Sequence, residues 1–349
     1  MERLLKRLGG AMLGLAIASF TGFAGVSAAS AETVLKYSPW LPPQHAVHVG
    51  LLRPWGEEVE RVTDGRVKLE FLPKAVGKPA EQFDVVRDGL ADMGVILPGY
   101  TPGRFPLLEI GELPLLSSDA AVIAPAFYRI YTKYLEPLQP LKGTHVITIF
   151  STTPNQIVTK GSIVRKVADL NGLKLRAPTV TSIPIINALG AVPVQKPVSE
   201  MYELASSGIV DGTFFAATAV VDWKLGKLLP YMTKVPGGIG QPVMAFLINE
   251  AKWDSISEAD RKAITAISGE ALAAKAGENY AASENEAYGK LKADGVTIED
   301  ANPELTSQLE KTLAPIDEKW VETAKQDGLD NAETILGEFR AELKKASAN

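Results

Sequence analysis

Residues 173–215 read LKLRAPTVTSIPIINALGAVPVQKPVSEMYELASSGIVDGTFF, and their pattern decides the fold class. Short apolar runs alternate with stretches that have helical spacing. The pattern predicts strands at residues 173–176, 192–195 and 213–215, with helices at residues 182–189 and 199–206. Strands that alternate with helices are typical of an α/β domain built on a largely parallel sheet.

The same order of elements occurs earlier in the chain. Strands are predicted at residues 34–40, 67–72 and 93–97, and helices at residues 48–62 and 81–91. In both stretches a helix ends at a glycine, Gly89 or Gly208, and an acidic residue and an apolar strand follow. Glycine suits this position because it accepts a left-handed conformation that other residues resist. The sequence therefore predicts two lobes of related topology.

The last third of the chain has a different pattern. It contains no proline from Ser257 to Gly295, which predicts one very long helix across both lobes, kinked or broken at Gly269, Gly277 or Gly289. A further helix begins at residues 302–304, where asparagine, proline and an acid follow one another. Its apolar stripe comprises Leu305, Leu309, Leu313, Ile316 and Trp320.

The first residues have the features of a targeting segment. Three basic residues precede an apolar stretch at residues 9–25, and the small residues Ala29, Ser30 and Ala31 follow. This order predicts a signal peptide at residues 1–31 that is cleaved before Glu32, and hence export to a bacterial periplasm. The alternative is an uncleaved membrane anchor, because the apolar stretch approaches spanning length.

Composition excludes several classes of protein. Without residues 1–31 the chain keeps 33 basic and 40 acidic side chains, a formal charge of −7. This balance argues against nucleic acid and anionic membranes as partners. The chain has no cysteine, which excludes disulfides, thiol catalysis and thiolate metal sites. An exported chain without disulfides also fits a periplasm.

No catalytic motif stands out in the sequence. The chain lacks the zinc-protease, serine-hydrolase and phosphate-loop motifs. His45 and His48 lie three residues apart, but a metal site would need a third ligand nearby. We therefore predict no enzyme activity, no cofactor and no metal. A secreted hydrolase with two distant acids in a cleft is the competing hypothesis.

Several motifs, in order along the chain, resemble one known family. They are Gly65-Arg66-Val67, Glu70-Phe71-Leu72-Pro73, Glu112-Leu113-Pro114, the stretch Asp169-Leu170-Asn171-Gly172-Leu173-Lys174-Leu175-Arg176-Ala177-Pro178, Leu189-Gly190-Ala191-Val192-Pro193-Val194, and Gly208-Ile209-Val210-Asp211-Gly212. Together they resemble the DctP family, the extracytoplasmic subunits of tripartite ATP-independent periplasmic (TRAP) transporters. The resemblance implies two lobes around a cleft, a small organic carboxylate as ligand, and membrane permease subunits of a TRAP transporter as partners.

This resemblance sets the expected fold. It is α/β, a two-lobed periplasmic binding protein of type II-like form, with a long helix crossing both lobes and a helical C-terminus. Lobe 1 is predicted to take residues 32–154 and about 242–281, including a return strand near residues 243–248. Lobe 2 is predicted to take residues 155–241 and about 282–349.

Arg176 is the first candidate for ligand binding. The resemblance implies that its guanidinium forms a two-pronged salt bridge with the ligand carboxylate. A planar fork can make two parallel charge-assisted hydrogen bonds, which a lysine cannot. Arg176 also ends a predicted strand, where open α/β sheets place their ligands. The alternative is a surface arginine on an edge strand.

Two departures from the family pattern bear on the ligand. Many members have a second arginine about twenty residues earlier, where residues 153–157 have none and Gln156 is the nearest polar candidate. Phe214 and Phe215 replace part of a polar stretch, although strand alternation directs at least one of them into a core. These changes favour a monocarboxylate with an aromatic or apolar body over a C4-dicarboxylate.

The loop after the first predicted strand supplies the remaining candidates. Trp40 and His45 lie where the other lobe would touch the ligand, and Trp40 could stack on a ring or fill a core. The predicted function is the periplasmic capture of a small organic carboxylate for uptake driven by an ion gradient. The alternatives are a C4-dicarboxylate-binding subunit and a binding protein that reports to a membrane receptor.

Overall fold

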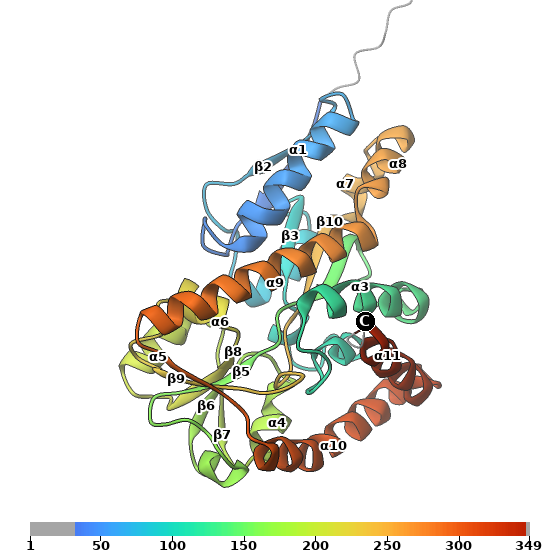
Figure 1. Cartoon of the computed structure of the whole chain (residues 1–349). Coiled ribbons are helices and arrows are strands. Elements are labelled where there is room, and N and C mark those ends of the chain that lie inside the picture. The colour runs from blue at the N-terminus through green and yellow to red at the C-terminus, as the bar shows by residue number, and fades with distance from the viewer. Residues whose placement is uncertain (1–31, 347–349) are drawn as a thin grey trace, which may run out of the picture. The chain divides into compact units, whose positions relative to one another are not determined.

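The computed structural model describes residues 32–346, so the predicted signal peptide lies outside the described residues. A first sheet has the strand order β2-β1-β3-β10-β4, and Figure 1 labels its strands β2, β3 and β10. Its strands are β1 (Thr33–Ser38), β2 (Val67–Phe71), β3 (Met93–Ile96), β4 (Thr144–Ser151) and β10 (Val243–Asn249). Strand β10 is the predicted return strand, and its presence in this sheet is confirmed.

A second sheet has the order β11-β9-β5-β8-β6-β7. Its strands are β5 (Gln156–Thr159), β6 (Lys174–Ala177), β7 (Val192–Gln195), β8 (Gly212–Phe215), β9 (Tyr231–Lys234) and β11 (Thr297–Asp300). Strand β6 runs parallel to β7 and β8, as predicted. Strands β5 and β10, which the two connecting segments lead into, each run antiparallel to both of their neighbours.

The two segments that connect the sheets are paired with each other. The amide of Thr152 donates to the carbonyl of Pro242 at 2.9 Å, and the amide of Asn155 donates to Gly240 at 2.9 Å. The carbonyl of Asn155 accepts in turn from Ile239 at 2.8 Å. The connection is therefore a short hydrogen-bonded ribbon rather than two independent strands of chain. The exact division of the chain into lobes remains a prediction.

The helices follow the sequence pattern with shorter bounds. They are α1 (Arg53–Val62), α2 (Gln82–Arg87), α3 (Ala120–Ile130), α4 (Ser182–Ala188), α5 (Met201–Ser206), α6 (Ala217–Asp222), α7 (Glu250–Asp254), α8 (Glu258–Ala266), α9 (Gly269–Ala293), α10 (Pro303–Gln326) and α11 (Ala332–Ala346). The helix predicted from residue 48 begins as one π-helical turn and becomes α-helical at Arg53. Proline follows in the first turn of α1 and has no N–H to donate, and the carbonyl of Gly50, four residues earlier, accepts from the side-chain amide of Asn279 at 2.6 Å.

One long helix was predicted from Ser257 onward, and the structure has two. Helix α8 begins after Ser257, whose hydroxyl accepts from the amide of Asp260 as predicted. The break lies at Gly269, which has a φ of +63°. A residue in this left-handed region cannot continue an α-helix. Gly277 and Gly289 remain inside α9, so only the first of the three glycines interrupts the helix.

Helix α9 packs against both halves of the molecule (Figure 1). Its first half contributes Leu272 and Tyr280 to the core around the first sheet. Its second half contributes Ala287 and Leu291 to a core beside the second sheet. The predicted long helix that crosses both lobes is therefore confirmed, although it is shorter than expected.

The C-terminal helices bury the predicted apolar stripe. All five of its residues lie in one core cluster, which also contains residues of both sheets. Helix α10 contacts α4 beside the second sheet, whereas α11 contacts α3 beside the first. The indole of Trp320 donates to the carbonyl of Pro106 at 3.1 Å. The helical C-terminus thus joins elements from both parts of the fold.

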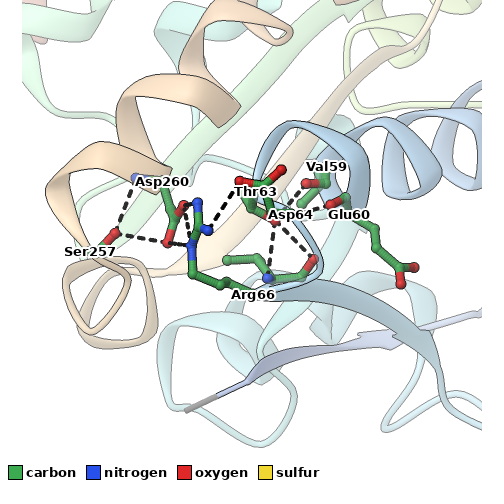
Figure 2. Close-up of polar contacts among 8 residues, drawn as sticks. Val59, Glu60, Thr63, Asp64, Arg66, Ser257 and Asp260 are labelled. Carbon is green, nitrogen blue, oxygen red and sulfur yellow. Dashed lines mark hydrogen bonds and ion pairs between the residues drawn. The ribbon is translucent and has the colours of Figure 1, made fainter. Parts of the chain in front are cut away.

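Figure 2 shows a contact that fixes α8 to the first sheet. The guanidinium of Arg66, the residue directly before β2, donates to both carboxylate oxygens of Asp260, with a shortest distance of 2.8 Å. The Ser257 hydroxyl donates to the same carboxylate at 2.8 Å. Hydrogen bonds from Arg66 are the main cause that lowers the pKa of Asp260, so this carboxylate stays ionised.

Candidate ligand-binding site

A cavity of about 540 Å³ contains most of the candidate residues. Its walls come from the loop after β1, the turn after β3, the ribbon between the sheets, the end of β8, and helices α6 and α9. Drug-sized and metabolite-sized ligands occupy cavities of roughly 300–1,000 Å³. The cavity is therefore large enough for a small organic acid.

Arg176 lies in this cavity wall and is only 1 % exposed. Its Nε donates to the backbone carbonyl of Lys196 at 2.8 Å, which holds the side chain in one orientation. Its Nη1 is buried and has no hydrogen-bond partner. A buried guanidinium nitrogen without an acceptor is costly, so Nη1 has hydrogen-bonding capacity that a bound acceptor could use. The alternative of a surface arginine is excluded.

The neighbours of Arg176 are aromatic. The guanidinium carbon lies 5.2 Å from the ring centroid of Phe215, within cation–π range. Burial raises the pKa of Tyr100, and the nearby Arg176 guanidinium opposes this rise. Burial likewise lowers the pKa of Arg176, although an arginine in a protein remains protonated. Arg176 therefore presents a full positive charge inside a largely apolar wall.

Trp40 lines the same cavity. Its indole Nε1 donates to the carbonyl of Val95 at 2.8 Å, so its polar edge is already satisfied. Its ring lies 6.1 Å from the ring of Tyr100 at a tilted angle. The two predicted roles, core packing and cavity lining, thus coexist in one side chain.

His45 also lines the cavity, whereas His48 lies in the core behind it. Burial lowers the pKa of each to about 4, so both rings are neutral at physiological pH. The Nδ1 of His48 lies 3.1 Å from the carbonyl of Pro42, which can only accept, so this nitrogen carries the proton. Its Nε2 then accepts from the Tyr37 hydroxyl at 3.0 Å. The two histidines do not form a metal site.

Phe214 and Phe215 point to opposite faces of β8. Phe215 lines the cavity. Phe214 is fully buried in the main core and does not reach the cavity, which corrects its prediction as a ligand-binding residue. Side chains alternate along a strand, so only one of the two could face the ligand.

Gln156 also lies outside the cavity. Its Oε1 accepts from the amide of Val235 at 2.6 Å, and its Nε2 lies 3.4 Å from the carbonyl of Pro154. The side chain therefore links β5 to the segment after β9. The predicted ligand contact of Gln156 does not fit this position and is corrected here.

Sequence reasoning missed several residues of the wall. These are Tyr100, Thr152, Thr153, Asn155 and Tyr280. Thr153 and Asn155 belong to residues 153–157, where many family members have a second arginine. The sequence did not indicate which side chains of this stretch would line the cavity. Tyr280 comes from α9, far along the sequence, and only the packing of that helix brings it to the cavity.

Two further observations concern residues 32–346. Within this range no three histidine or acidic side chains lie close enough together to hold a metal ion. No helix within this range combines the length and the apolar character needed to cross a membrane.

A family model for bacterial extracellular solute-binding proteins, family 7 (DctP), matches residues 37–323. The chain belongs to this family. The resemblance predicted from the sequence motifs is thereby confirmed. Solved structures of TRAP solute-binding proteins also confirm the predicted fold class.

Three solved structures resemble this DctP chain, and each comparison covers 90 % of this chain and 99 % of the other. A TRAP periplasmic solute-binding protein from Bordetella bronchiseptica, with bound (R)- and (S)-mandelate, is 35 % identical with a TM-score of 0.86. A protein from an unidentified marine microbe, specific for aromatic acid ligands and bound to 3-hydroxybenzoate, is 31 % identical with a TM-score of 0.85. A protein from Rhodoferax ferrireducens, in complex with benzoate, is 26 % identical with a TM-score of 0.84.

Proposed function

We propose that this DctP protein captures an aromatic monocarboxylate in the periplasm and delivers it to the membrane subunits of a TRAP transporter. One observation carries the proposal. The cavity combines a single buried cation, Arg176, with the aromatic side chains of Trp40, Tyr100 and Phe215.

The charges of the wall favour one carboxylate over two. Lys290 is the other permanently cationic side chain among the lining residues, and it is exposed and paired with Asp294 at 3.0 Å. A second carboxylate in the cavity would therefore lose its hydration without gaining a buried cationic partner. One carboxylate on Arg176 meets no such penalty.

The aromatic walls favour a ring as the rest of the ligand. Burial of apolar surface contributes about 25 cal/mol per Å², so a ring that buries on the order of 100 Å² gains about 2–3 kcal/mol. The ligands of the three similar structures, mandelate, benzoate and 3-hydroxybenzoate, are aromatic acids with one carboxylate. Delivery to a permease and a periplasmic location follow from the TRAP family and from the predicted signal peptide.

A binding assay tests the proposal. Isothermal titration calorimetry of the purified protein should detect binding of benzoate, mandelate or 3-hydroxybenzoate and much weaker binding of succinate. A ligand that binds only the folded state also raises the melting temperature, which gives an independent readout. Tighter binding of succinate than of every aromatic acid would overturn the proposal.

A further inference from the structure

A second group of polar side chains lines the cavity with hydrogen-bonding capacity unused. We call residues 152–155, which join β4 to β5, the hinge segment. Its members Thr152, Thr153 and Asn155 all line the cavity and are at most 5 % exposed. These side chains therefore belong to the proposed ligand site, and the inference about what they bind rests on the proposed function.

In the described part of the chain the side chains of Thr153 and Asn155 have no hydrogen-bond partner, and neither has that of Thr152. The Thr153 hydroxyl is buried with no hydrogen bond. Asn155 uses its backbone N–H and carbonyl to pair with Gly240 and Ile239, but its side-chain amide makes no hydrogen bond to residues 32–346. Folded proteins rarely leave buried polar groups unpaired, so the Thr153 hydroxyl calls for a specific explanation. The Asn155 amide lines the cavity and is available to a bound group.

The strand register brings this pair to the same edge of the sheet as Arg176. Gln156, the first residue of β5, pairs with Phe215 at the end of β8. On the other side of β8, Thr213 pairs with Arg176 in β6. The Arg176 guanidinium lies over the ring of Phe215. Asn155 directly precedes Gln156, so the start of β5 and the strand of Arg176 flank β8, whose last residue is Phe215.

Arg176 alone does not satisfy a carboxylate. Its Nε is already used by the carbonyl of Lys196, which leaves only the two terminal nitrogens for a ligand. A carboxylate offers about four lone-pair sites. Further donors are needed, and a threonine hydroxyl and an asparagine amide can supply them without adding charge.

We propose that Thr153 and Asn155 form an uncharged second anchor for the ligand carboxylate, in place of a second cation. The carboxylate of an aromatic monocarboxylic acid lies between the Arg176 guanidinium and the hinge segment. Its ring lies against Phe215 and Trp40. The anchor accommodates one negative charge and provides no partner for a second, so it determines the specificity for monocarboxylates.

The test compares Asn155→Ala and Thr153→Val with wild type, using calorimetry with benzoate, mandelate and 3-hydroxybenzoate. Hydrogen bonds to a charged group are strong, so we expect the dissociation constant to rise roughly tenfold to a hundredfold in each variant. Asn285→Ala is the matched control, because Asn285 is exposed on α9 outside this cavity. It should bind as wild type does.

Ligand-free stability separates a binding role from a structural one. Thr153 makes no side-chain hydrogen bond in the protein, so Thr153→Val should melt at the same or a higher temperature while binding weakens. Unchanged affinity in both variants would mean that these groups hold only water, and would overturn the anchor while the proposed function stands. Failure of the wild type to bind any of the three acids would overturn both.

Discussion

The carboxylate of Glu112 accepts a hydrogen bond from the Thr181 hydroxyl at 2.7 Å, across the boundary between the two halves of the fold. Its other oxygen accepts from the amide of Val243, the first residue of β10, at 3.1 Å. Glu112 is only 2 % exposed, and burial raises its pKa to about 7. Thr181 lies shortly after the strand of Arg176, so one titratable group joins the turn after that strand to the start of β10.

We expect Glu112→Gln to change how stability depends on pH. Between its unfolded pKa of about 4.5 and about 7, folded Glu112 keeps a proton that the unfolded chain has released. Its contribution to stability therefore falls as pH rises through this window and is constant above it. The free energy of unfolding of Glu112→Gln relative to wild type should rise between about pH 5 and pH 7.5 by on the order of a few kcal/mol.

Urea unfolding at several pH values measures this difference. Other groups titrate in the same range, namely Glu109, with a pKa raised to about 7, and His45, His48 and His145, with pKa values lowered to about 4. They are present in both proteins, but the charge of Glu112 also contributes to the raised pKa of Glu109, so the comparison reports Glu112 together with its coupling to Glu109. Parallel pH profiles for the variant and the wild type would show that Glu112 does not titrate in this way.

Arg176→Ala should abolish ligand binding and leave the fold intact. Removing one partner of a desolvated charge pair costs about 2–5 kcal/mol, which is a roughly thirtyfold to several-thousandfold loss of affinity. Arg176→Lys should bind poorly as well, since an ammonium cannot reach both the Lys196 carbonyl and a carboxylate as a planar fork does. Calorimetry with benzoate checks both variants, and wild-type affinity in Arg176→Ala would exclude the carboxylate role.

Asn155→Arg should change the ligand class. An arginine here would place a second cation in the cavity, so we expect a gain of at least tenfold in succinate affinity and a loss for benzoate. Without ligand the variant should melt at a lower temperature, because two cations then share a buried site. Gln156→Arg is the matched control, since Gln156 lies outside the cavity. Equal succinate affinities in the two variants would contradict the expected position of residue 155.

Two glycines of α9 provide a matched pair for stability. A Cβ at Gly277 would lie 2.5 Å from the carbonyl oxygen of Ala120, whereas a Cβ at Gly289 would meet nothing within 4 Å. Gly277→Ala should therefore destabilise the protein by about 1–3 kcal/mol through overpacking. Gly289→Ala should stabilise it by about 0.5–1 kcal/mol, because alanine favours the helix. Urea unfolding of both variants checks the opposite signs.

The sequence predicted the order of elements well, because strand alternation and helical spacing are local properties. It also identified Arg176, Trp40, His45 and Phe215, all of which line the cavity. Local pattern could not choose between neighbouring positions. The sequence indicated Gln156 as the nearest polar candidate, whereas in the structure Gln156 bonds the amide of Val235 and its neighbour Asn155 lines the cavity.

The same limit applies to the long helix. Gly269 and Gly277 are identical in sequence terms, yet one has a positive φ that ends a helix and the other lies against the backbone of α3. Gly269 is needed for its backbone conformation, whereas Gly277 is needed because its missing side chain lets α9 approach α3. Both depend on neighbours that are distant in the sequence, such as Ala120, and no local pattern contains them.

The hydrogen bond from Arg176 to the carbonyl of Lys196 has a consequence for the thermodynamics of capture. A free arginine side chain has about 2 kcal/mol of rotamer entropy to lose when it becomes ordered. Here most of that loss occurs during folding, before any ligand arrives. The association step then orders mainly the ligand itself, so more of the interaction energy remains as affinity, as in any preorganised receptor.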